Sequence, residues 1–201
     1  MKVFSDTAYI RVGGRPEEKK AAEYLRQQVV KFGLEAALEP FDVPLGDIEE
    51  ATLLADGVSI PCKGYMCAGS STVEAPFYYL RTTDAWSLRQ CKGKIVLIDG
   101  YLGYWIYQDL LENGAVGFVT YDGHVNYADR DIDARELRSY VSNGKIIPGV
   151  NINVKDAVSL IEKGVKSAQI VLKQKEYMGT SQNVVLDMPG EVDEYIVFTA
   201  H

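Results

Sequence analysis

The stretch Ser181-Gln-Asn-Val-Val-Leu-Asp-Met-Pro-Gly-Glu-Val-Asp-Glu-Tyr-Ile-Val-Phe-Thr-Ala-His201 contains two apolar runs, Val184–Leu186 and Tyr195–Phe198. Between them, Pro189 presets one backbone angle of a turn and Gly190 provides the permissive position beside it. The second run is rich in β-branched and aromatic residues, which predicts a buried strand. His201 follows it, at the place where open α/β sheets hold ligands and metals. The stretch therefore predicts a strand hairpin that ends at a candidate metal ligand.

The composition is that of an ordinary globular protein of one or two domains. Of the 201 residues, 47% are hydrophobic and 24% are charged, which is enough for a sizeable core. The formal net charge is −7. Because so acidic a surface repels nucleic-acid phosphates and anionic membranes, we expect neither as a partner. No apolar run approaches the ~20 residues that a membrane-spanning helix requires.

The amino terminus and the cysteines bear on the compartment. Residues 1–6 contain no apolar core of a signal peptide. The three cysteines, Cys62, Cys67 and Cys91, are odd in number and lack the spacing of a zinc site. We expect free thiols in a reducing compartment, with a single disulfide left open as an alternative. The predicted location is the cytoplasm.

An amphipathic helix is predicted between Pro16 and Gly33. Proline is well tolerated at the first helical position, and glycine is typical just after the last one. Ala21, Leu25, Val29 and Phe32 have the spacing of one helix face, which should pack on a sheet. Residues 34–39 then alternate between two faces, as in a strand.

The segment from Pro44 to Lys173 alternates short β-prone runs with glycine-containing and polar turns. One helix is predicted at Tyr104–Asn113, between two apolar runs, so the three elements should form a strand–helix–strand unit. A second helix should begin after Asn153 as N-cap and end at Gly164. The runs predicted as strands are Ala51–Ala55, Val58–Ile60, Phe77–Leu80, Ile95–Ile98, Gly117–Thr120, Gly149–Ile152 and Ala168–Leu172.

Two outer segments resemble one enzyme family. The terminal sequence NVVLDMPG…EYIVFTAH resembles the hairpin that leads into the first metal ligand of the di-zinc aminopeptidases, the exopeptidase group related to glutamate carboxypeptidase and the transferrin receptor ectodomain. In that family an aspartate follows the histidine two positions later, in an H-x-D motif. The early sequence RVGGRPEEKKAAEYLRQQVVKFGLEAALEPFDV resembles the family's amino-terminal helix and strand.

The middle segment resembles a protease-associated domain. Its markers are CKGKIVLIDG, then a helix, ENGAVGFVTYDG, and IPGVNINVKDAVSLIEKG. Domains of this kind are inserted into these aminopeptidases before the strand with the first metal ligand. The order of the three resemblances along the chain is the order found in the family, and together they cover nearly all of it.

The resemblance implies an α/β fold in which a β-rich protease-associated domain, a sheet or barrel with flanking helices, is inserted into the amino-terminal part of a zinc-exopeptidase α/β sandwich. The implied parts are residues 1–43 (peptidase helix and strand), 44–174 (inserted domain) and 175–201 (peptidase hairpin). The implied parent is a zinc aminopeptidase that binds two zinc ions and acts on peptide substrates.

By the same resemblance His201 is the first zinc ligand, and the other ligands and the catalytic glutamate are absent from this chain. The chain itself is thus expected to be a truncated, inactive fragment without zinc. We expect it to self-associate through the exposed strands of its peptidase part. Two alternatives stay open: a non-catalytic peptide-binding or protein-binding module of the protease-associated type, and a free-standing small α/β ligand-binding domain.

Other candidate residues point to weaker hypotheses. Tyrosine and tryptophan are enriched in binding surfaces, so Tyr101, Tyr104, Trp105 and Tyr107 form a candidate peptide-facing patch. Asp129, Asp131 and Asp133 have part of a calcium-loop spacing, but Ala134 replaces the required glycine, so we interpret them as a solvated acidic loop. We expect His124 to be exposed, and the turn at residues 99–103 lacks the lysine of a phosphate-binding loop.

Overall fold

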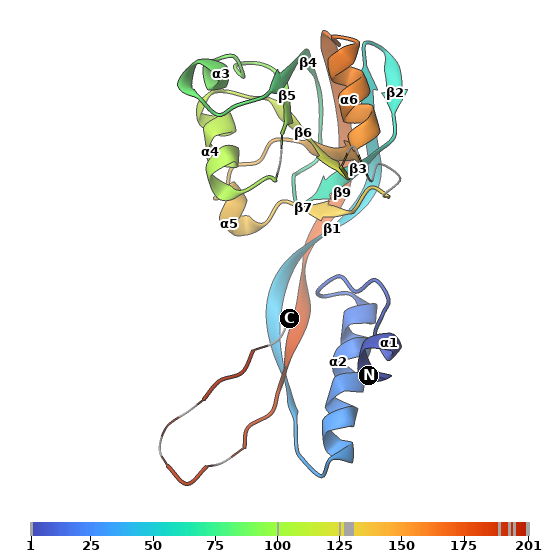
Figure 1. The fold of residues 1–201 in the computed structure, drawn as a ribbon, viewed down its shortest axis with the longest axis vertical. Helices are drawn as coiled ribbons and strands as arrows, with labels where there is room; N and C mark the ends of the chain where they lie inside the picture. The colour runs from blue at the N-terminus through green and yellow to red at the C-terminus, as the bar shows by residue number, and fades with distance from the viewer. Residues whose placement is uncertain are drawn as a thin grey trace. The chain divides into compact units, whose positions relative to one another are not determined.

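The computed structural model describes residues 2–99, 101–124, 126, 131–188, 190–192, 194 and 196–199. It divides the chain into two compact units, residues 1–43 with 178–201, and residues 44–177 (Figure 1). In the described residues the elements are α1 (Lys2–Asp6), α2 (Pro16–Lys31), β1 (Ala37–Ala55), β2 (Val58–Ile60), β3 (Cys62–Met66), β4 (Ser71–Leu80), α3 (Ala85–Arg89), β5 (Ile95–Ile98), α4 (Tyr104–Glu112), β6 (Gly117–Asp122), β7 (Arg135–Glu136), α5 (Ser139–Ser142), β8 (Gly149–Asn153), α6 (Val154–Glu162) and β9 (Ser167–Val185).

The described strands form one mixed sheet of nine strands in the order β2-β1-β9-β4-β5-β6-β8-β3-β7. Its centre, β4-β5-β6-β8, is parallel, and β9 and β3 flank this block in antiparallel pairing. The predicted strand–helix–strand unit is confirmed as β5-α4-β6, because β5 and β6 pair in parallel. The predicted α/β class is also confirmed.

The core of the second unit lies around β5. All four of its residues are buried, which is typical of a parallel strand covered on both faces. Helix α4 packs Tyr107 and Leu110 inward, and α6 packs Val154, Ala157 and Leu160 inward. Figure 1 shows α4 and α5 next to each other on one side of strands β5 and β6, and α6 on the opposite side. Ile161 on α6, although apolar, is 38% exposed.

A glycine allows the close approach of β6 and β8. Gly149 lies opposite Phe118 in the register of the two strands, and a Cβ atom built at Gly149 would lie 2.0 Å from the Phe118 ring. That ring also makes edge contacts with Tyr65 and Tyr107, at centroid distances of 4.9 and 5.8 Å. Only glycine fits here without moving an aromatic cluster in the middle of the core.

Strand β1 differs from its prediction. We expected one strand at residues 34–39 and another at Ala51–Ala55, but β1 continues without a break from Ala37 to Ala55, through Pro40 and Pro44. Strand β2 pairs only with the last three residues of β1, Leu53, Leu54 and Ala55. The earlier part of β1 thus has one side without a strand partner among the described residues, and proline is tolerated on such an edge.

The first unit contains α1, α2, the start of β1 and the end of β9. The helix predicted from Pro16 is confirmed as α2, but only part of its apolar stripe is buried. Ala21 is 5% exposed, whereas Leu25 is 37% and Phe32 is 83% exposed. The predicted packing of this stripe on a sheet is thus confirmed for the burial of Ala21 and is wrong for Leu25 and Phe32, which are exposed.

The predicted carboxyl-terminal strand hairpin is also only partly confirmed. Val184 and Val185 end strand β9, as expected. Residues 196–199 form no strand, and Ile196, Val197 and Phe198 are 83%, 77% and 92% exposed. An apolar run indicates a preference for burial, but a strand also needs a partner, and no described residue pairs with this run. Pro189, Tyr195, Ala200 and His201 lie outside the described residues.

Candidate functional site

No metal site is present in the described part of the chain. Its described residues contain no group of three or more histidine, cysteine, aspartate or glutamate side chains that could hold an ion. Catalytic zinc needs three protein ligands and an open position. The predicted ligand, His201, lies outside the described residues. The described residues therefore do not fit a zinc ion.

A buried polar network occupies the carboxyl end of β6 and the neighbouring strand β8. We call Tyr65, Thr120, Asp122, Arg135 and Asn151 the Asp122 network. Thr120 donates its hydroxyl proton to Asn151 Oδ1 at 2.8 Å, so the Tyr65 hydroxyl, also at 2.8 Å, donates to Thr120. Asn151 Nδ2 donates to Asp122 Oδ2, and Arg135 Nη2 donates to Asp122 Oδ1. The network joins β3, β6, β7 and β8.

The Asp122 network fixes the chain where it returns to the sheet after β6. The Asp133 backbone N–H donates to Asp122 Oδ2 at 2.7 Å, and Asn151 Nδ2 donates to the Asp133 carbonyl at 3.1 Å. Burial alone would raise the pKa of Asp122, but hydrogen bonds from Arg135, the Asp133 backbone and Asn151 outweigh it and lower the pKa. Burial raises the pKa of Tyr65 to about 12. At neutral pH the network thus contains a carboxylate and a neutral phenol.

Every described member of this network has a partner. No buried side-chain nitrogen or oxygen among the described residues is without a hydrogen bond. A ligand-binding group needs a donor or acceptor that is still available, and Asp122 already accepts three hydrogen bonds. We therefore interpret the network as a structural clamp that holds four strands in register.

A second polar group lies at the same edge of the parallel block. Tyr121 donates its hydroxyl to Asp99 Oδ1 at 2.5 Å, and burial, followed by the Asp99 carboxylate, raises the pKa of Tyr79 on β4. Burial, followed by the Asp99 carboxylate, raises the pKa of Tyr121 to about 12. The sequence predicted only a turn in this region. The missed signal is the aspartate that directly follows the buried strand β5, together with the one that ends β6.

The predicted tyrosine patch divides into surface and core residues. Tyr101 is 69% and Trp105 is 78% exposed, and the Tyr104 ring makes an edge contact with Trp105 at 5.1 Å. Tyr107 is fully buried; its hydroxyl donates to the Lys145 carbonyl at 3.0 Å and accepts from the Ile147 N–H at 3.1 Å. Tyr107 is therefore a core residue and is not part of a binding surface.

The remaining candidates show no chemistry of a site. Cys62, Cys67 and Cys91 are free thiols, and burial raises the pKa of all three, so none is an activated nucleophile. His124 is exposed, as expected, and its Nδ1 accepts a hydrogen bond from the Asn126 N–H at 3.2 Å. Asp129 lies outside the described residues. No helix in the described residues is long and apolar enough to cross a membrane.

Comparison with solved structures identifies proteins of the same fold. The chain superimposes on a zinc aminopeptidase from Bacillus subtilis with a TM-score of 0.70 at 24% sequence identity, over 96% of this chain and 47% of that one. An aminopeptidase from Aneurinibacillus sp. strain AM-1 gives a TM-score of 0.66 at 21% identity, over 95% and 47%. An M28 peptidase precursor from Shewanella amazonensis SB2B gives 0.62 at 17% identity, over 91% and 48%.

The chain thus spans about half the length of the zinc aminopeptidases that it matches. At these identities the likeness establishes a shared fold. No protein-family model and no curated protein matches the chain.

Proposed function

We propose that this chain is the amino-terminal half of a zinc-dependent aminopeptidase that removes residues from the amino termini of peptides. The observation behind the proposal is that nearly the whole chain has the fold of one half of such enzymes. The sequence motifs point to the same family independently of the fold. In this proposal His201 is the first zinc ligand, and the remaining ligands and the general base belong to a segment after residue 201.

The first unit provides further support. Several of its large apolar side chains are exposed, among them Phe32 directly after α2, Phe41 on β1 and Phe198 near the carboxyl terminus. Exposed apolar surface of this kind marks an interface that another part of a protein covers. We propose that the other half of the peptidase domain covers it, and that in the isolated chain the same surface leads to self-association.

The second unit is proposed to be the protease-associated domain. The described residues of its core cluster, which surround β5, all belong to this unit. A unit of this kind can fold independently while it is inserted between two parts of an enzyme. It would shape access of peptides to the catalytic centre.

The direct test is to read the source gene beyond codon 201 and to express the protein that it encodes. The expected sequence has an aspartate two positions after His201, and the full protein should hydrolyse an aminoacyl-p-nitroanilide in the presence of zinc. His201→Ala should abolish the hydrolysis. His124→Ala is a matched control, since these are the two histidines of the chain and His124 is exposed.

A stop codon directly after His201 would overturn the proposal, as would full activity of the His201→Ala variant. In that case the second candidate function, a non-catalytic peptide-binding module, would be favoured by the exposed Tyr101 and Trp105.

A further inference from the structure

The chain contains two asparagine–glycine steps, Asn113-Gly114 after α4 and Asn143-Gly144 after α5. In a step of this kind the backbone nitrogen of the glycine can attack the side-chain amide of the asparagine, because glycine has no side chain that hinders the approach and leaves the backbone free to rotate. Each asparagine is the C-cap of its helix. The two steps thus share their sequence and their position at a helix end, but they differ in how firmly the fold holds them.

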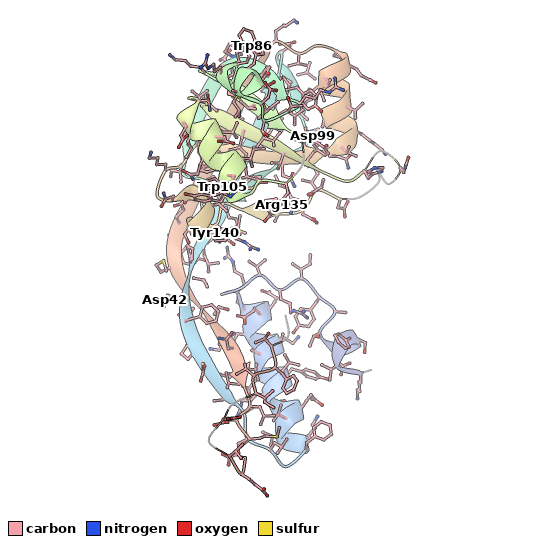
Figure 2. All side chains as sticks on the ribbon, turned by 60° about the vertical axis from the view of Figure 1, so that its left-hand side comes forward. Asp42, Trp86, Asp99, Trp105, Arg135 and Tyr140 are labelled. Carbon is pink, nitrogen blue, oxygen red and sulfur yellow. The ribbon has the colours of Figure 1, made fainter. Side chains whose placement is uncertain are left out.

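The step at Asn143 is exposed and weakly held. Asn143 and Gly144 are both exposed, and a Cβ atom built at Gly144 meets no atom within 4 Å outside its chain neighbours. Asn143 has a left-handed backbone with φ of 47°. Within the described residues, neither the Gly144 N–H nor the Asn143 side-chain amide forms a hydrogen bond. Tyr140, in the same helix, is 60% exposed and lies on the outside of the second unit (Figure 2). Water therefore reaches both reacting groups.

The step at Asn113 is held by hydrogen bonds on both sides. The Gly114 N–H donates to the Leu111 carbonyl at 3.1 Å, and the Gly114 carbonyl accepts from the Gly93 N–H at 2.7 Å. Asn113 Nδ2 donates to the Asp109 carbonyl at 2.8 Å. Rotation of the backbone at this step would break these bonds. Asn113 can therefore react only when this part of the unit opens.

We propose that Asn143 is a site of spontaneous deamidation in the folded protein and that Asn113 is protected from it. The Gly144 nitrogen, after losing its proton, bonds to Asn143 Cγ, and the C–N bond of the side-chain amide breaks as ammonia leaves. Water then opens the resulting cyclic imide. Opening at Cγ gives aspartate, and opening at the backbone carbonyl gives isoaspartate. Water is the only co-reactant, and no atom is oxidised or reduced.

The modification changes both the charge and the backbone after α5. Either product carries a carboxylate, which adds one negative charge to a formal net charge of −7. Isoaspartate also lengthens the backbone by one carbon atom, inside the turn in which the Lys145 N–H donates to the Ser142 carbonyl at 3.0 Å. The Lys145 carbonyl in turn accepts the hydroxyl proton of the buried Tyr107 at 3.0 Å. The reaction therefore alters a turn that contacts the core of the second unit.

The experiment compares the two steps within one protein. The folded protein is incubated at mildly alkaline pH, and peptides that contain each asparagine are followed by mass spectrometry. The tryptic peptide of residues 139–145 should gain the mass difference between O and NH and separate into two products by chromatography. Modification of Asn113 should be slower by about tenfold or more, because its hydrogen bonds must open first. In guanidinium chloride, where the fold holds neither step, the two rates should converge.

Matched variants assign the charge change to its residue. Asn143→Gly removes the reactive amide and keeps the left-handed backbone, since glycine accepts a positive φ. On isoelectric focusing, the acidic species that the incubated protein accumulates should be absent from Asn143→Gly and should persist in Asn113→Gly.

Equal rates at the two steps of the folded protein, or a faster reaction at Asn113, would overturn the inference. So would an unmodified Asn143 in folded protein after the denatured chain has reacted. The readouts do not involve peptidase activity, so this inference can fail while the proposed function stands.

Discussion

The two units of this chain contain similar sequence patterns but bury them to different extents. In the second unit, apolar runs such as β5 are completely buried, and the aromatic rings of Tyr65, Tyr107 and Phe118 lie together in the core. In the described part of the first unit, the buried residues are Thr7, Ala21, Ala22 and Ser181, while Phe32 and Phe198 are 83% and 92% exposed. Apolar periodicity identifies the face of a helix or strand that would be stabilised by burial. It does not show whether another part of the protein covers that face.

The largest effect is expected from Asp122→Ala. This change leaves the buried Asn151 amide without its carboxylate acceptor and removes the main partner of the Arg135 guanidinium, whose side chain is 34% exposed. It should lower the free energy of unfolding of the second unit by about 3 kcal/mol, the lower end of the range for breaking a fully buried ion pair. Urea unfolding followed by near-ultraviolet circular dichroism measures it, because the buried aromatic residues of the described chain belong to this unit. Asp131→Ala, at an exposed position, is the control and should change the value little. Equal effects would show that the clamp does not stabilise the unit.

A smaller effect is expected from Gly149→Ala. The added methyl group would overlap the Phe118 ring, and overpacking of this kind costs about 1–3 kcal/mol. The same unfolding experiment applies. Gly190→Ala, in the first unit, is matched to it because a Cβ atom there meets no other atom within 4 Å. A loss of stability at Gly190 as large as that at Gly149 would contradict the contrast between the two units.

The stability of the second unit should depend on pH through Asp122. Since its pKa is lower in the folded protein than in the unfolded chain, Asp122 stabilises the fold above its unfolded pKa of about 3.9. This contribution is lost as the pH falls through the lower folded pKa. The free energy of unfolding, measured from pH 7 down to pH 3, should therefore fall at the acidic end, and less steeply in Asp122→Asn. Identical slopes for both proteins would exclude Asp122 as the titrating group.

The smallest change in stability is expected in the first unit. Phe32→Ser alters a side chain that is 83% exposed, so the free energy of unfolding should change by no more than about 0.5 kcal/mol. Self-association, measured by sedimentation velocity at high concentration, should decrease because an exposed apolar group has been removed. If the parent chain sediments as a monomer at every concentration, the proposed self-association through this unit is wrong.

The sequence predicted the second unit better than the first because its signals are local. Gly114 and Gly164, both with positive φ, follow α4 and α6 as expected, and Asn153 caps α6 by accepting from the Lys155 N–H. Strand β5 has the predicted bounds. The continuity of β1 was missed, since Pro40 and Pro44 are strand breakers except where one edge has no partner.

The candidate site was less predictable, because its residues meet only through strand pairing. Asp122, Arg135 and Asn151 are far apart in the sequence, and the parallel register of β6 and β8 brings two of them together. Tyr107 was predicted on the surface because tyrosine is compatible with the core and with the surface. In the structure it is a core residue, because its hydroxyl forms hydrogen bonds with the backbone after α5. The predicted role of His201 stays a prediction.

In this chain the apolar side chains of the second unit are enclosed in a core, whereas many of those in the described part of the first unit are exposed. Native-state hydrogen exchange measures this residue by residue. Amides of β5, β6 and β8 should exchange only when the second unit unfolds as a whole, whereas those of α2, a 16-residue helix with two buried residues, should exchange through low-energy local opening. Protection of α2 as strong as that of β5 would contradict the account.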